Sequence, residues 1–221
     1  MSKRFWIIIA AIAVIFIGFL YFGGNKGDKG SSSASTSNHV KGKLDSKVTL
    51  IEYGDFQCPV CGGYYPIVTQ LMEKYQDKIK FQFRNLPLSQ VHPNAFAAAR
   101  AAEAASEQGK FWQMYDQLFT NQTTWSSGSA NSASSYFKQY AAAIGLDSAK
   151  FDKAFSSSQV NNAINADMNE FKKTGDPLAT PTFYLNGKNI PLKEIAGESG
   201  APTLENFSAK IDAALKAAGQ Q

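Results

Sequence analysis

The feature that most constrains this chain is the motif Cys58-Pro59-Val60-Cys61, which contains its only two cysteines. The motif directly follows an apolar, strand-like segment and begins a helical pattern. Proline is favoured at the first position of a helix, because its missing N–H would have no partner there anyway. The pattern therefore predicts a strand, a sharp turn and a helix for which Cys58 is the N-cap, the residue just before the first helical one.

Cys58 is expected to ionise more readily than a free cysteine. The unpaired N–H groups and the positive end of the helix dipole favour its thiolate, and the thiolate is the attacking form of cysteine. Cys61 follows three residues later on the same helical face, close enough to form a disulfide. We therefore expect an exposed Cys58, a buried Cys61 and thiol–disulfide chemistry.

The two cysteines have three other possible uses. A structural disulfide between Cys58 and Cys61 would close a very short loop and remove little chain entropy. A zinc site would need more ligands, and the two histidines, His39 and His92, lie in unrelated contexts. A Cys–His hydrolase built from Cys58 and His92 would leave the second cysteine without a use. Redox chemistry uses both cysteines and is the interpretation we prefer, with no metal site expected.

Glu52 is the candidate acid of the site, six residues before Cys58. Strand alternation places it on the same face as Val48 and Leu50, which is expected to be buried. A carboxylate there is unfavourable unless it can take up a proton. We expect Glu52 to relay the proton of Cys61; the alternative is an exposed acid at the end of a strand.

The order of predicted elements indicates a small α/β core interrupted by helices. Residues 48–84 read as strand, helix and strand, which is a βαβ unit. Helical patterns dominate 93–174, with a polar surface loop predicted at 120–133. A hairpin that turns at 186–187 and an amphipathic helix at 204–218 follow. The arrangement βαβ, helices, ββα predicts one sheet-containing core with an inserted all-helical subdomain.

The N-terminal segment predicts a membrane anchor. Residues 5–22 carry no charge and would span roughly 27 Å as a helix, about the thickness of the bilayer core. A cleaved signal peptide is the alternative, but the apolar segment is long for one and ends in a poor cleavage site. We expect one uncleaved transmembrane signal-anchor.

The complete predicted organisation has five parts. They are a cytoplasmic basic start (1–4), the transmembrane anchor (5–22), a flexible Gly/Ser linker (23–39), a core in two pieces (40–91 and 176–219) and the helical insertion (92–175).

The charge pattern predicts the compartment and excludes one class of partner. Lys3 and Arg4 precede the anchor and keep the N-terminus in the cytoplasm, so the catalytic part of this single-pass protein is expected outside the cell membrane, where disulfides persist. These are two of 22 basic side chains, and the other 20 nearly balance the 18 acidic ones. Such a balance argues against binding nucleic acid through its phosphates.

Glu52, the CPVC motif and Thr180-Pro181 together resemble the DsbA-like branch of the thioredoxin superfamily. The stretch YGDFQCPVC, residues 53–61, is especially similar to the membrane-anchored bacterial members. The resemblance covers residues 40–218 and implies a thioredoxin-like fold. It also implies that Pro181 is a cis-proline beside the cysteines and that the backbone of Thr180 pairs with the substrate, whereas on residue pattern alone Pro181 could simply start a strand.

The resemblance implies a dithiol oxidase that introduces disulfides into secreted or cell-surface proteins. Its substrates would be unfolded or partly folded chains, and a quinone-linked membrane partner of the DsbB type would reoxidise it. No metal or organic cofactor is expected, because the Cys58–Cys61 disulfide is itself the redox group. Val60 departs from the family, which commonly has histidine there; losing that positive charge should raise the Cys58 pKa and weaken the oxidant.

The sequence is compatible with either direction of thiol–disulfide exchange. A disulfide reductase or isomerase would keep Cys58 reduced, and a non-enzymatic copper chaperone would use the cysteines as soft ligands. An apolar surface around the motif would suit unfolded substrates. Its candidate residues, which could equally belong to the core, are Phe56, Tyr64, Phe96 and Trp112.

Overall fold

The structure is a computed structural model that describes residues 36–220. The predicted anchor at 5–22 and most of the predicted linker lie outside the described residues. Across 36–220, none of the helices combines the length and the apolar character needed to span a bilayer.

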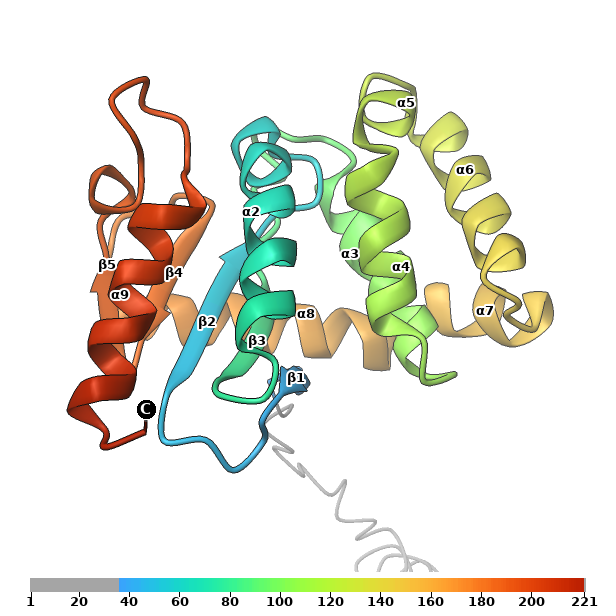
Figure 1. Ribbon diagram of the computed structural model, residues 1–221. Coiled ribbons are helices and arrows are strands. Elements are labelled where there is room, and N and C mark those ends of the chain that lie inside the picture. The colour runs from blue at the N-terminus through green and yellow to red at the C-terminus, as the bar shows by residue number, and fades with distance from the viewer. Residues whose placement is uncertain (1–35, 221) are drawn as a thin grey trace, which may run out of the picture. The chain divides into compact units, whose positions relative to one another are not determined.

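A five-stranded sheet runs through the described part of the chain (Figure 1). In spatial order β1-β3-β2-β4-β5, the strands are β1 (His39–Gly42), β3 (Lys80–Asn85), β2 (Thr49–Gly54), β4 (Thr182–Leu185) and β5 (Lys188–Ile190). Strands β2 and β3 are parallel, and every other neighbouring pair is antiparallel. The predicted βαβ unit and the C-terminal hairpin are therefore both confirmed.

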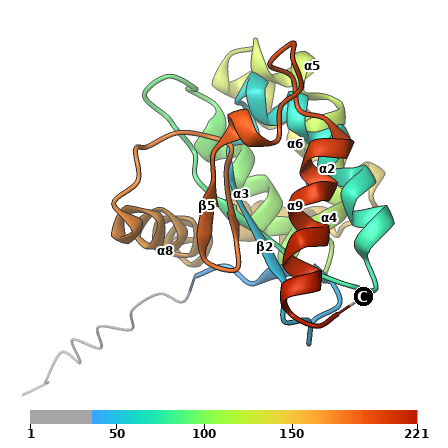
Figure 2. The same ribbon diagram turned by 60° about the vertical axis from the view of Figure 1, so that its left-hand side comes forward.

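Helices cover both faces of the sheet. They are α2 (Pro59–Tyr75), α3 (Ala95–Ser106), α4 (Phe111–Thr120), α5 (Gln122–Ser126), α6 (Ala130–Ala143), α7 (Ser148–Phe155), α8 (Ser158–Thr174), the 3-10 turn η1 (Leu192–Glu194) and α9 (Leu204–Ala217). Helices α2 and α9 lie side by side on one face, as both views show (Figures 1 and 2). Helix α8 crosses the opposite face behind β2 and β3. Helices α3 to α8 are all inserted between β3 and β4.

Aromatic side chains join the insertion to the sheet. The ring of Phe56, in the turn after β2, lies 5.1 Å from Phe83 of β3 and 5.0 Å from Phe119 of α4, measured between centroids. Tyr115 of α4 packs edge-on against Phe83 at 5.1 Å. All four side chains are buried, so the turn that leads to Cys58 is packed against both parts of the fold.

The prediction of a polar surface loop at 120–133 is wrong. Helix α5 occupies part of this segment, and Trp125 within it is completely buried. Its ring packs edge-on against Phe137 at 5.1 Å, and its Nε1–H donates to the carbonyl oxygen of Leu118 at 2.8 Å. The segment therefore packs around a buried indole, although the serines, glycine and asparagines around it had indicated an exposed loop.

Two boundaries also differ from the sequence expectation. The helical pattern through 93–119 divides into α3 and α4 because Gly109 adopts a left-handed conformation, with φ of 71°. The fold also begins before residue 40, since Ser37 donates through its N–H to Asp167 at 2.9 Å and His39 contacts Glu103 at 2.6 Å. Asp167 and Glu103 both belong to the helical insertion. The prediction of a linker at 23–39 therefore missed the contacts that fix Ser37 and His39.

Candidate active site

The motif Cys58–Cys61 lies where β2 turns into α2, as predicted. Cys58 is the N-cap of α2, with an extended backbone, and Pro59 is the first helical residue. The Cys58 N–H donates to the carbonyl oxygen of Asp55 at 3.1 Å, and the Asp55 carboxylate accepts from the N–H of Gln57 at 2.8 Å. These bonds close a tight turn that holds the Cys58 sulfur at the start of the helix.

Cys58 has a pKa lowered to about 5. The largest cause is a hydrogen bond from the Cys61 thiol, and burial opposes it. Thr180 and the backbone N–H groups of Cys61 and Val60 lower the pKa further. Cys58 has no side-chain capping bond of normal geometry, and the positive end of the helix dipole acts in the same direction as these N–H groups.

The expectation of an exposed Cys58 is wrong, because its side chain is only 5% exposed. The Cys58 Sγ lies against Thr180, and in its thiol form it donates to the Thr180 carbonyl oxygen at 3.4 Å. The Thr180–Pro181 peptide bond is cis, as the resemblance implied. The Thr180 hydroxyl is buried and has no hydrogen-bond partner among residues 36–220, so it is free to donate to a thiolate at Cys58.

Cys61 lies deeper than Cys58, and its pKa is shifted in the opposite direction. It is fully buried, and burial raises its pKa well above the ordinary value. Its hydrogen bond to Cys58 and the nearby charges of Cys58 and Glu52 raise the pKa further. In the reduced pair the remaining proton therefore stays on Cys61 while Cys58 is the thiolate.

Glu52 lies on the buried face of β2, as predicted. It is 1% exposed, and burial raises its pKa to about 8, with the charge of Lys41 and the Tyr115 hydroxyl opposing the rise. The Glu52 Oε2 and the Tyr115 hydroxyl are both buried without a hydrogen-bond partner of normal geometry in the described part of the chain. Glu52 is therefore protonated at neutral pH and lies close enough to Cys61 for the two to affect each other's charge.

Lys41 is a site residue that the sequence reasoning missed. Burial lowers its pKa, while the charges of Asp116 and Glu52 oppose this change. Its Nζ lies 4.5 Å from the centre of the Trp112 ring, which suits a cation. Lys41 falls within the predicted core, but no sequence pattern indicates that it lies near Glu52. Its position near Glu52 follows only from the pairing of β1 with β3 in the structure.

Two amide side chains that the sequence reasoning also missed attach the helical insertion to the active-site turn. Gln122 of α5 donates through Nε2 to the carbonyl oxygens of Phe56 and Cys58 at 2.8 and 2.9 Å. Gly62 allows this approach, because a Cβ there would lie 2.4 Å from Gln122. Gln57, in the active-site turn, donates in return through its Nε2 to the carbonyl oxygen of Ser126 in α5 at 2.7 Å.

The remaining predicted residues divide between surface and core. Pro59 and Val60 are exposed beside the sulfur, Val60 by 50%. Phe56 and Tyr64, candidates for an apolar binding surface, are buried, and Phe96 and Trp112 are partly buried against the cores. The exposed apolar surface near Cys58 is therefore formed by other residues.

Comparison with known families and structures agrees with this geometry. The family described as Thioredoxin matches residues 34–213. A thioredoxin-like oxidoreductase from Silicibacter pomeroyi DSS-3 is 25% identical, with a TM-score of 0.65 over 81% of this chain and 92% of that one. BdbD from Bacillus subtilis, in its oxidised form, is 23% identical, with a TM-score of 0.67 over 83% of this chain and 97% of that one.

Curated relatives match over a smaller part of their own length. A protein named Na(+)/H(+) antiporter NhaA 1, from Mycolicibacterium gilvum (strain PYR-GCK), is 39% identical over 155 residues, which are 68% of this chain and 24% of that protein. A protein named Na(+)/H(+) antiporter NhaA 1 from Salinispora arenicola (strain CNS-205) is 35% identical over 80% of this chain and 25% of its own length. The chain spans about a quarter of the length of these relatives.

Proposed function

This chain belongs to the thioredoxin family, and from that premise we propose that it oxidises dithiols in substrate proteins through Cys58 and Cys61. The fold is thioredoxin-like with a helical insertion, as in the DsbA-like oxidoreductases. The observation that carries the proposal is the contrast between the two sulfurs. Cys58 has a pKa of about 5, and Cys61 has a pKa well above the ordinary value.

The first half of the reaction forms a mixed disulfide. A substrate thiolate attacks the Cys58 sulfur of the oxidised pair, the Cys58–Cys61 bond breaks, and its electron pair moves to Cys61. The Cys61 thiolate is unfavourable in its buried site, so it takes up a proton. Protonated Glu52, with its pKa of about 8, is the proposed donor.

The second half releases the product. A second substrate thiolate attacks the substrate sulfur of the mixed disulfide, and Cys58 leaves as a thiolate. A thiol of low pKa is a good leaving group, and the lowered pKa of Cys58 therefore favours this step. The substrate has lost two electrons, and the enzyme holds them as the reduced cysteine pair.

The low pKa of Cys58 also supports the oxidising direction. Whatever stabilises the reduced pair makes the disulfide a stronger oxidant. Thr180 and Cys61 hold the pKa near 5 even though Val60 supplies no positive charge. A reductase or isomerase would use the same atoms, so the direction is a matter of reduction potential.

The proposed setting is the outer face of a cell membrane. The uncharged segment 5–22 and the basic residues before it support a single-pass anchor with the catalytic part extracytoplasmic. The substrates are then unfolded or partly folded secreted proteins. A quinone-linked membrane partner of the DsbB type would accept the electrons, and the anchor would keep the two proteins in one plane.

Trapping and potentiometry test the proposal together. The Cys61→Ala variant cannot release a bound substrate by internal attack, so in cells it should accumulate Cys58 mixed disulfides that Cys58→Ala lacks. The potential of the wild-type pair, measured against glutathione, should lie well above about −200 mV. A value near thioredoxin's, about −270 mV, would overturn the oxidising direction and favour a reductase.

A further inference from the structure

His92 is bonded to the active-site turn, and no step of the proposed reaction uses it. Its Nδ1 lies 2.7 Å from the Oδ2 of Asp55, a residue of the turn that leads to Cys58. A carboxylate only accepts hydrogen bonds, so the imidazole donates through Nδ1. The Asp55 side chain is fully buried and that of His92 is 18% exposed. The bond therefore lies in surroundings of low dielectric, where it is stronger than in water.

Asp55 joins His92 to both cysteines. Its carboxylate also accepts from the N–H of Gln57 at 2.8 Å, inside the turn. Its carbonyl oxygen accepts from the Cys58 N–H at 3.1 Å, and its own N–H bonds to the Cys61 sulfur. One residue therefore contacts the two cysteines through its backbone and His92 through its side chain.

The chain between β3 and α3 holds the turn at further points. The Leu88 N–H donates to Asp55 Oδ2 at 2.9 Å, and the Asn94 N–H donates to the Oε1 of Gln57 at 2.6 Å. Residues 55 and 57 are therefore both attached to this chain. Loss of the His92 ring removes one attachment and leaves the others, so it should shift the turn rather than unfold it.

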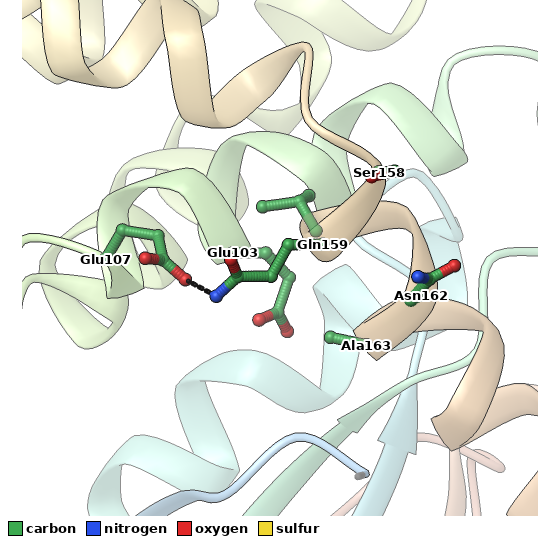
Figure 3. Close-up of a pocket in the computed structure, with 7 residues that line it drawn as sticks. Glu103, Glu107, Ser158, Gln159, Asn162 and Ala163 are labelled. Atoms are coloured by element: carbon green, nitrogen blue, oxygen red, sulfur yellow. Dashed lines mark hydrogen bonds between the residues drawn. The ribbon is translucent and has the colours of Figure 1, made fainter. Parts of the chain in front are cut away.

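A second histidine–carboxylate pair is not bonded to the turn and provides the comparison. His39 Nε2 lies 2.6 Å from Glu103 Oε1, and both side chains are buried. Glu103 lines a hollow between α3 and α8, where Glu107 accepts from Gln159 at 3.0 Å (Figure 3). In the described chain, no side-chain hydrogen bond of His39 or Glu103 reaches the turn at residues 55–58.

The donors around Cys58 act on its sulfur only while the sulfur keeps its place. The Cys61 thiol, Thr180 and the N–H groups of Cys61 and Val60 all stabilise the Cys58 thiolate. Such bonds weaken steeply as their distance and angle depart from the optimum. The disulfide carries no such charge, so a displaced sulfur destabilises the reduced pair more than the oxidised one. A less stable reduced pair makes a weaker oxidant.

We propose that His92 is a positioning residue for thiol–disulfide exchange: through Asp55 it fixes the turn that holds Cys58 and so raises the reduction potential of the cysteine pair. The Asp55 carboxylate has three donors, the His92 ring and the N–H groups of Gln57 and Leu88, and it loses one of them without the imidazole. The inference rests on the proposed function.

Potentiometry and thiolate titration of the full-length chain test it. Two glutathione molecules reduce the disulfide and leave the reduced pair and one glutathione disulfide. In His92→Ala the equilibrium constant of this reaction should fall about fivefold, which is about 20 mV. The midpoint of Cys58 alkylation should rise by about 0.7 pH unit, the same factor. His92→Asn places an amide N–H near the position of Nδ1, and its equilibrium constant should stay within about twofold of wild type.

His39→Ala is the matched control, because it also removes an imidazole from a buried carboxylate. It should lower the urea concentration at which the chain unfolds but keep the wild-type potential and midpoint. If His92→Ala does not fold, His92→Leu fills much of the same space without a donor and gives the same comparison.

A wild-type potential in folded His92→Ala, or an equal shift in His92→Asn or His39→Ala, would overturn the positioning role while exchange with glutathione upheld the proposed function. A low wild-type potential that falls further in His92→Ala would overturn the oxidising direction and uphold the positioning role. Failure of the wild type to exchange with glutathione would contradict the proposed function itself, and the positioning role with it.

Discussion

The outer and inner sides of the active-site turn place ionisable groups in opposite states. On the outer side, Cys58 lies beneath Thr180 and has a pKa of about 5. On the inner side, Glu52 lies among the aromatic rings of the core and has a pKa of about 8. At neutral pH the outer group carries a negative charge and the inner one holds a proton.

Burial alone does not explain this difference, because the side chains of Cys58 and Glu52 are 5% and 1% exposed. Burial is the largest cause of the raised pKa of Glu52, whereas hydrogen-bond donors outweigh burial at Cys58. Cys58 is approached by the Cys61 thiol, the Thr180 hydroxyl and helix N–H groups. Glu52 Oε2 has no hydrogen-bond partner in the described chain. A buried negative charge is stable here only where donors are already in place.

The most severe change removes the outer group. Cys58→Ser replaces a sulfur of low pKa with a hydroxyl that stays protonated at neutral pH, so disulfide exchange should fall by at least about 10³-fold. The measurement is the rate of oxidation of a dithiol peptide. Cys61→Ser serves as the comparison, since its Cys58 thiolate should still attack the disulfide of an oxidised peptide, expel one peptide sulfur as a thiolate and retain the other in a mixed disulfide. Appreciable turnover by Cys58→Ser would show that the outer sulfur is not the one that reacts.

The next change replaces the carboxyl group on the inner side, Glu52. Between the ordinary pKa of 4.5 and the folded value of about 8, folded Glu52 binds more protons than the unfolded chain does. The contribution of Glu52 to stability should therefore fall as the pH rises through this window, by on the order of 4 kcal/mol. In Glu52→Gln this fall should disappear, because the amide does not titrate.

Urea unfolding of the oxidised protein, in which Cys58 has no thiol to titrate, measures the effect of Glu52→Gln at pH 5 and pH 8. Glu73→Gln is the matched control, since Glu73 is exposed on α2, and it should keep the wild-type loss of stability. An identical loss in Glu52→Gln and wild type would mean that the inner carboxylate is ionised at neutral pH, and the comparison between the two sides would fail.

A smaller change acts on one donor of the outer side. Thr180→Val removes the hydroxyl that lowers the Cys58 pKa and should raise that pKa by about one unit, the equivalent of one hydrogen bond to a charged group. Titration of the thiolate by ultraviolet absorbance measures it. Thr180→Ser keeps a hydroxyl and should stay near the wild-type value. Equal values for valine and serine would assign the effect of residue 180 to its backbone alone.

The smallest expected effect concerns the contact between the insertion and the turn. Gln122→Ala removes the Nε2 donor from the carbonyl oxygens of Phe56 and Cys58, which should lower the free energy of unfolding by about 1 kcal/mol. Gln113→Ala, exposed on α4, should change it by less than half as much. Equal losses in the two variants would show that the amide bridge does not contribute to the stability of the turn.

The three ionisable groups of the site were predictable from sequence, whereas the burial of Cys58 and the charge that opposes Glu52 were not. Cys58, Pro59 and Cys61 are close in sequence, and helix-capping rules relate them directly to a lowered pKa. The position of Glu52 on a buried face followed from strand alternation. Its opposing charge, Lys41, depends on a strand pairing that the sequence did not indicate.

The helical insertion shows the same limit at a larger scale. Its presence between two parts of the sheet followed from the order of the elements. The bonds from Gln122 did not, because they join residues 66 and 64 apart in the chain. The burial of Trp125 did not either, because it depends on how the neighbouring helices α4, α5 and α6 pack. Polar composition at 120–133 indicated a loop, whereas the structure has helix α5 there, with Trp125 buried between α4 and α6.

The ionisation of Cys58 in the reduced wild-type protein tests the central claim most directly. The measurement is the rate of alkylation, together with thiolate absorbance, followed from pH 3 to pH 10. Cys61 should not contribute within the lower part of this range, because its pKa is raised well above the ordinary value. The account predicts a single midpoint near pH 5. A midpoint near that of free cysteine, about 8.5, would contradict it.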